Sequence, residues 1–190
     1  MAGDVHDRMV EAAMAMLAQR GLQATSFSEL LAATGAPRGS LYHHFPGGKD
    51  QLVAKAVERA GAVLLNALEA AAGSPADAIV ERFLAIWRHV LTQSDCGSGC
   101  AVLAVTVGTN AAEQLAQTTA VFRAWRQRLA QLLRQGGLTD TQSRQFAVFL
   151  IAAVEGAVVL SRADQSPEPF EEVARRLLQD VRAMVKRPAA

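Results

Sequence analysis

Residues 25–49 have the sequence TSFSELLAATGAPRGSLYHHFPGGK, and this segment carries the most specific structural signals in the chain. Ser26 and Glu29 have the spacing of a capping box, which predicts a short helix over residues 27–34 that the next glycine ends. A proline suits the first turn of a helix, so a further helix is predicted over residues 37–44. Two short helices joined by a Gly-Ala turn indicate a helix-turn-helix, whose second helix has a suitable length to enter the major groove of DNA.

The two short helices carry different kinds of residue on their two faces. We expect four apolar residues to hold the pair together: Leu30, Leu31, Leu41 and Phe45. The other face of the second helix carries hydrogen-bonding side chains and a glycine, and the starts of the flanking helices offer hydroxyls and an ammonium for phosphates. The predicted DNA-binding residues are Thr25, Ser26, Arg38, Gly39, Ser40, Tyr42, His43, His44 and Lys49.

This segment resembles the DNA-binding signature of TetR-type transcriptional repressors, in particular through the aromatic-His-Phe core that is followed by Lys49. The resemblance covers about the first fifty residues. It implies a homodimer that binds a palindromic operator, and a divergent helical domain that binds a small molecule and then releases the DNA. By family position, Tyr42, His44 and Lys49 resemble residues that contact the DNA backbone. Four other positions resemble residues that contact bases or a groove of the DNA: Arg38, Gly39, Ser40 and His43.

Two features depart from the usual family pattern. Pro37 stands where many members carry a serine that caps the recognition helix, and Gly47-Gly48 lengthens the junction before the lysine by about one residue. Both features, together with residues 99–105 and 155–163, resemble the LmrA/YxaF subgroup.

The rest of the chain predicts an all-α fold. Ala, Leu, Gln, Glu and Arg dominate, and the period-two alternation of β-strands is almost absent. About nine helices are expected, over residues 4–20, 27–34, 37–44, 49–72, 75–94, 100–108, 111–135, 140–162 and 170–185. We expect a DNA-binding domain over residues 1–48 and a ligand-binding and dimerisation domain over residues 49–190, of which residues 49–72 form a connecting helix.

Charge and composition restrict the possible classes. The 190 residues are 51% hydrophobic and carry a net charge of +1, which excludes a disordered chain and offers no global attraction to DNA. Up to Ala60 there are six basic and six acidic residues, so contact with DNA must depend on local placement. The apolar run over residues 147–160 is too short for a membrane span, and residues 1–20 lack the pattern of a secretion signal. We expect a cytoplasmic protein with no membrane partner.

The larger domain contains aromatic residues that could line an effector cavity or simply form its core. A hydrophobic or aromatic effector would suit such walls. The predicted ligand-binding residues are Phe83, Trp87, His89, Thr106, Asn110, Phe122, Trp125 and Glu155. Glu155 interrupts an apolar run, and a buried carboxylate needs a partner. A hydrogen bond across the dimer or to Arg162 would explain Glu155 equally well.

The last two predicted helices have wide apolar stripes and small residues that permit close helix packing. A four-helix bundle with a symmetry mate is the natural use of such a surface. The predicted dimerisation residues are Phe149, Ala153, Gly156, Ala157, Leu177 and Val181.

The sequence gives little support for a metal site or an enzyme active site. Cys96 and Cys100 lack a second ligand pair for zinc, so we expect free thiols; a thiol-reactive sensor is the alternative, with Cys96 in a loop as the more exposed candidate. His43 and His44 point about 100° apart on a helix and cannot readily share a metal. No catalytic triad or phosphate loop can be assembled, so neither enzyme nor cofactor is expected. The alternative function is a small-molecule carrier or sequestering protein of the same fold.

Overall fold

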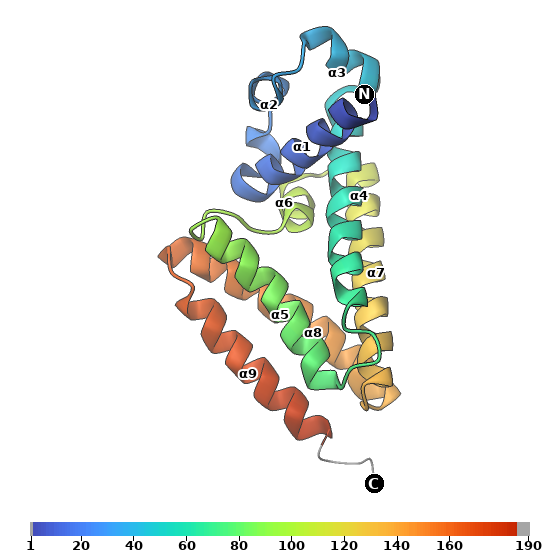
Figure 1. Ribbon diagram of the computed structural model, residues 1–190, viewed down its shortest axis with the longest axis vertical. Coiled ribbons are helices and arrows are strands. Elements are labelled where there is room, and N and C mark those ends of the chain that lie inside the picture. Colours follow the sequence, from blue (N-terminus) through green and yellow to red (C-terminus); the bar gives the residue numbers. More distant parts are fainter. Residues whose placement is uncertain (1, 186–190) are drawn as a thin grey trace. The chain divides into compact units, whose positions relative to one another are not determined.

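The computed structural model describes residues 2–185, and within that range the chain forms nine helices and no strand (Figure 1). The side chains of residues 2–4 and of Arg38 lie outside this description. The helices are α1 (Ala2–Ala24), α2 (Phe27–Thr34), α3 (Arg38–His44), α4 (Gly48–Glu69), α5 (Ala76–Gln93), α6 (Ala101–Gly108), α7 (Ala112–Gln135), α8 (Asp140–Asp164) and α9 (Glu168–Val185). The all-α prediction is confirmed.

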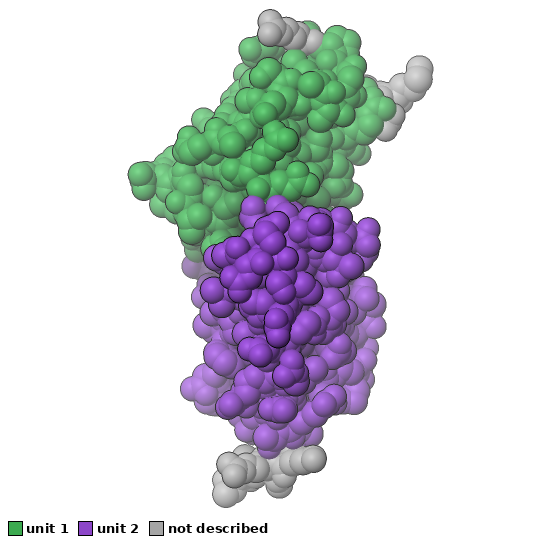
Figure 2. Space-filling model, turned by 90° about the vertical axis from the view of Figure 1, so that its left-hand side faces the viewer, with its two compact units in different colours: residues 1–63, 100–121 green, residues 64–99, 122–190 purple. Residues whose placement is uncertain are grey.

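The chain divides into two compact units, which Figure 2 colours separately. Unit 1 comprises residues 1–63 and 100–121, and unit 2 comprises residues 64–99 and 122–190. Helices α4 and α7 therefore each contribute residues to both units. These units are defined by how compactly their residues pack together, which is not a test of function. The functional boundary after residue 48 therefore stays a prediction.

Local signals explain where several helices begin and break. Gly21 interrupts α1 with φ 80° and ψ 178°, at the position where the apolar stripe predicted an end. The Thr139 hydroxyl accepts from the backbone N–H of Gln142, whose side chain accepts from the Thr139 N–H, and this reciprocal capping box begins α8. The Cys100 sulfur accepts from the Leu103 N–H at 3.3 Å and caps α6.

In unit 1, α1 packs against α2 and α6. The core includes Met9, Leu17, Leu30, Leu41 and Phe45, each fully buried. Because the apolar residues of α1 recur every three or four positions, they lie on one side of the helix and are buried together.

The segments of α4 and α7 within unit 1 approach each other closely. A Cβ atom on Gly61 would lie 2.9 Å from Cγ1 of Val121, a separation that Cβ atoms do not adopt in real structures. Glycine is therefore required at this crossing for its size.

In unit 2, α5, α8 and α9 pack on one another around Phe83, Phe146 and Phe170. The Arg88 guanidinium links α5 to α9, because it donates to both carboxylate oxygens of Glu171 at 2.6 and 3.0 Å. Such a bidentate pair orients the two helices as well as attracting them.

Two further contacts join the ends of α4, α5 and α7 within unit 2. Arg128 donates to both carboxylate oxygens of Glu69 at 2.7 and 2.6 Å, and these hydrogen bonds hold the pKa of Glu69 below its ordinary value. A Cβ atom on Gly136 would lie 2.6 Å from the backbone nitrogen of Ala76 and 2.9 Å from the Ser74 carbonyl oxygen. Glycine at position 136 therefore allows the turn after α7 to lie directly against the start of α5.

Helix α8 has the length and hydropathy of a membrane span. Half of its most apolar window is buried, and α8 packs on α5 and α9 within unit 2. This packing explains the hydropathy of α8 as that of a core helix in a folded protein.

Candidate nucleic-acid interface

Helices α2 and α3 form the predicted helix-turn-helix. The Ser26 hydroxyl accepts from the Glu29 N–H at 3.3 Å and begins α2, which Gly35 ends in the left-handed conformation with φ 65°. A Cβ atom on Gly35 would meet no neighbouring atom within 4 Å, so the backbone conformation is what favours glycine there. Pro37 is extended and directly precedes the first helical residue of α3 without capping it. The side-chain cap that many family members have at this point is therefore absent, as the sequence predicted.

One side of α3 is buried and the opposite side is exposed. Leu41 and the following Phe45 are fully buried, whereas the Tyr42 side chain is 65% exposed. Gly39 and His43 are exposed, and Ser40 and His44 are partly exposed. The predicted contact residues on α3 thus share an outward face with little charge. Arg38 belongs to the same helix, but its side chain lies outside the described residues.

Two groups of aromatic contacts that the sequence did not predict hold this face in position. The Tyr42 ring lies edge-to-face with Phe27 at the start of α2, with ring centroids 6.3 Å apart. The His6 ring of α1 stacks on Phe45 at 5.0 Å and meets His44 edge-on at 5.9 Å. Phe27 and His6 are positioning residues, and no local sequence signal could reveal them because their partners lie far along the chain.

Thr25 is not available to DNA through its side chain, which corrects the prediction. The residue is only 2% exposed, and its hydroxyl donates to the Gly21 carbonyl oxygen at 2.8 Å. Because the backbone of α1 is not helical at Gly21, the threonine hydroxyl supplies a donor at the point where the regular ladder is broken. Ser26 is partly exposed, but its hydroxyl already caps α2.

Lys49 also has an intramolecular partner. Its ammonium donates to the Leu22 carbonyl oxygen at 3.1 Å and so joins the start of α4 to the end of α1. An ammonium group has three N–H donors, so this bond leaves others for a phosphate oxygen. With the longer Gly47-Gly48 junction, the Lys49 ammonium thus lies beside the end of α1.

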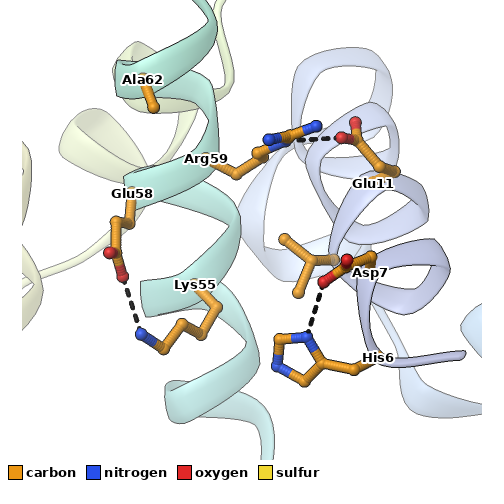
Figure 3. Close-up of a pocket in the computed structure, with 8 residues that line it drawn as sticks. His6, Asp7, Glu11, Lys55, Glu58, Arg59 and Ala62 are labelled. Atoms are coloured by element: carbon orange, nitrogen blue, oxygen red, sulfur yellow. Dashed lines mark hydrogen bonds and ion pairs between the residues drawn. The ribbon is translucent and has the colours of Figure 1, made fainter. Parts of the chain in front are cut away.

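Several other cations of this region are paired with carboxylates. Arg20 bonds to Glu29 at 2.8 Å. A groove of about 310 Å³ between α1 and α4 contains the Arg59–Glu11 pair at 2.6 Å and the Lys55–Glu58 pair at 2.9 Å (Figure 3). Pairs such as these reduce the number of cations in the module that are available for phosphates.

The predicted ligand-binding residues belong to both units. Five aromatic or acidic residues belong to unit 2: Phe83, Trp87, Phe122, Trp125 and Glu155. Of these, four are at most 8% exposed, and the partly exposed Phe122 lies edge-to-face with Trp125 at 5.3 Å. An apolar, aromatic interior is therefore present in this unit.

The prediction needs a correction at His89, which lies on the exposed side of α5, whereas Asn110 and Thr106 stay predictions. His89 is exposed, because two residues after Trp87 a helix presents almost its opposite side. Asn110 is exposed and belongs to unit 1. Thr106 also belongs to unit 1, and its hydroxyl donates to the Val102 carbonyl oxygen within α6.

The predicted dimerisation set needs a similar correction. Ala157, Leu177 and Val181 are at most 1% exposed, because they pack α8 and α9 into the core of unit 2. Phe149, Ala153 and Gly156 retain some exposure. Four large apolar side chains of α8 are about half exposed: Val148 (49%), Phe149 (50%), Val159 (52%) and Leu160 (55%). Three of these four were missed, because α8 is apolar on more than one face and periodicity could not identify the buried one.

Cys96 and Cys100 are both buried, and they are not joined in a disulfide. Cys96 is 4% exposed, so the expectation that it is the more exposed candidate for a thiol sensor is wrong; its N–H donates to the Leu91 carbonyl oxygen, which turns the loop inwards. Among the residues that the structure describes, no group of three or more His, Cys, Asp or Glu side chains could hold a metal ion.

Comparison with known proteins agrees with this geometry. Residues 9–56 match the family model of bacterial regulatory proteins of the tetR family, and residues 75–176 match the LmrA/YxaF-like C-terminal domain of transcriptional regulators. The uncharacterized HTH-type transcriptional regulator Rv0196 of Mycobacterium tuberculosis is 35% identical over 182 residues, covering 90% of this chain and 91% of its own. The HTH-type transcriptional regulator LmrA of Bacillus subtilis is 26% identical over 185 residues, covering 90% and 94%.

A solved structure shares the fold as well. The regulatory protein TetR from Rhodobacter sphaeroides matches with a TM-score of 0.82 and 24% identity, over 92% of this chain and 97% of that one. With helix-turn-helix, family models and relatives in agreement, this chain belongs to the TetR family of transcriptional regulators and carries a C-terminal domain of the LmrA/YxaF type.

Proposed function

We propose that this chain is a ligand-responsive repressor that binds a palindromic operator as a homodimer and releases it when a small hydrophobic or aromatic effector binds. The observation that carries the proposal is the one-sided burial of α3. Leu41 anchors one face in the core, while Gly39, Tyr42 and His43 are exposed on the other. An exposed tyrosine beside two histidines, on the side of the second helix that faces away from the core, fits contact with DNA.

Contacts with DNA divide into two kinds in this proposal. Tyr42, His44 and Lys49 hold the sugar-phosphate backbone and set the position of α3, and Gly39, Ser40 and His43 lie against base edges. Arg38 at the start of α3 joins the second group. Gly39 has open space around its Cβ position, so the backbone of α3 can approach the DNA closely there.

Dimerisation uses the exposed apolar side of α8. Phe149, Val159 and Leu160 are half exposed, and Gly156 between them lets a symmetry-related helix approach. A two-fold axis pairs each such surface with its own copy, which matches a palindromic site. In the DNA-binding state the two α3 helices should be roughly 34–36 Å apart, one turn of DNA.

The effector binds in the aromatic interior of unit 2, and α4 carries the response. Helix α4 begins at Gly48, four residues after α3 ends at His44, and α4 runs through residues of both units. When the effector changes the packing of unit 2, α4 shifts, and the short junction carries that shift to α3. The separation of the two α3 helices in the dimer then changes, and affinity for the operator falls.

The experiment that tests the proposal is a mobility-shift titration of the purified protein against fragments of its own genome. Repression is supported if the protein retards fragments sequence-specifically and if Tyr42→Ala and His43→Ala abolish this retardation. His89→Ala is the matched control, because it changes an exposed histidine on α5. Equally weak binding to all fragments would instead support the second candidate, a small-molecule carrier of the same fold. We place the protein in the cytoplasm, where an operator is accessible.

A further inference from the structure

The indole N–H of Trp87 is a buried donor with no hydrogen-bond acceptor among the residues that the structure describes. Trp87 lies on α5 in unit 2 and is only 5% exposed. Burying an N–H group without an acceptor carries a desolvation penalty, and the large majority of buried polar groups in proteins have a partner. A donor of this kind therefore marks a position where a molecule from outside the chain can supply the acceptor.

The surroundings of Trp87 on α5 indicate what kind of molecule this is. Phe83 lies one helical turn earlier on the same face and is 1% exposed, so this face of α5 carries two buried aromatic residues. The other buried residues of α5 near it, Leu84 and Leu91, are aliphatic. An indole nitrogen donates and cannot accept, so its partner must offer a lone pair.

We propose that Trp87 donates a hydrogen bond to an oxygen acceptor of the effector, which is an aromatic or apolar molecule that carries a carbonyl, ether or phenolic oxygen. The inference deepens the proposed function, since it rests on the binding of an effector in unit 2. It adds a chemical requirement: a pure hydrocarbon of the same shape leaves the donor unpaired and binds more weakly.

Acetophenone and α-methylstyrene test this requirement, because they have nearly the same shape and differ in a carbonyl oxygen replaced by a methylene group. The chain has two tryptophans, so its ¹⁵N–¹H spectrum should contain two indole signals, which Trp87→Phe and Trp125→Phe assign. Acetophenone at millimolar concentration should move the Trp87 indole proton downfield, and α-methylstyrene should not. Trp87→Phe should weaken acetophenone binding by about tenfold and α-methylstyrene binding by less than about threefold.

Three results would overturn the inference: no binding of acetophenone, equal affinities of the two probes for the wild-type protein, or an unmoved Trp87 signal in the acetophenone complex. Phe170→Leu is the matched control, because Phe170 is also fully buried in unit 2 and is not among the predicted ligand-binding residues. If Trp87→Phe does not fold, the spectra of the wild-type protein with the two probes decide alone. Operator binding is measured without either probe, so its failure would contradict the proposed function and leave this result standing.

Discussion

Truncating Phe149 to alanine should dissociate the proposed dimer. Phe149 is 50% exposed on α8, and a phenylalanine buries roughly 150–250 Å² when it is covered, so about 100 Å² is left for a partner. At about 25 cal/mol per Å², covering it contributes about 2.5 kcal/mol in each protomer. Alanine retains about 0.8 kcal/mol of this, so the loss is about 1.7 kcal/mol per protomer and about 3.4 kcal/mol per dimer. The dimer Kd should rise about 300-fold.

Sedimentation equilibrium over a concentration series measures this Kd directly. Val107→Ala is the matched control, because Val107 is 76% exposed on α6 and lies outside the proposed interface. Phe149 also lies edge-to-face with Phe146 at 6.1 Å, so its truncation costs some stability within the protomer. Leu160→Ala lacks that ring contact and should also weaken the dimer. An unchanged Kd for both α8 variants would refute the assignment of this face to dimerisation.

Three further predictions concern stability and salt. Gly136→Ala should destabilise the protein by about 3 kcal/mol in urea unfolding, because the new Cβ atom meets rigid backbone. Gly39→Ala has open space around the new Cβ atom and should stabilise α3 by about 0.5–1 kcal/mol. Equal effects of the two substitutions on the free energy of unfolding would contradict this prediction. Arg128 lowers the pKa of Glu69 in the folded protein. The stability from this pair is therefore present above the ordinary pKa of a glutamate and is lost as the pH falls through the lowered pKa. Glu69→Gln should make the free energy of unfolding depend less on pH in this acidic range. Arg38 and Lys49 of each protomer place about four cations per dimer against the DNA. Log affinity for the operator should therefore fall against log salt with a slope of about −4, and a slope near −10 would contradict this prediction.

The corrected residues illustrate the limits of a linear pattern. The Thr25 and Lys49 side chains have the right chemistry for phosphates, but both bond to carbonyl groups near the break in α1. The Lys49 bond joins residues 27 positions apart and so depends on how the start of α4 lies against the end of α1. His89 was predicted beside Trp87 because the two are close in sequence, yet it lies on the exposed side of α5.

The type and number of the helices, the helix-turn-helix and the family could all be predicted from the amino-acid sequence. These properties depend on caps, turn glycines and apolar spacing within a few residues of each other, and such signals are local. The near-zero net charge of the DNA-binding module could also be predicted from the sequence, since charges can be counted without knowing their partners.

Which residues are available for function depended on the packing of the folded chain. Helix α8 is apolar on several sides, and its packing with α5 and α9 buries Ala157 while leaving Phe149 half exposed. The interior of unit 2 likewise buries the indole of Trp87 without an acceptor among the described residues. Burial depends on contacts between segments far apart in the chain, and for this reason it follows from the fold and not from any short stretch of sequence.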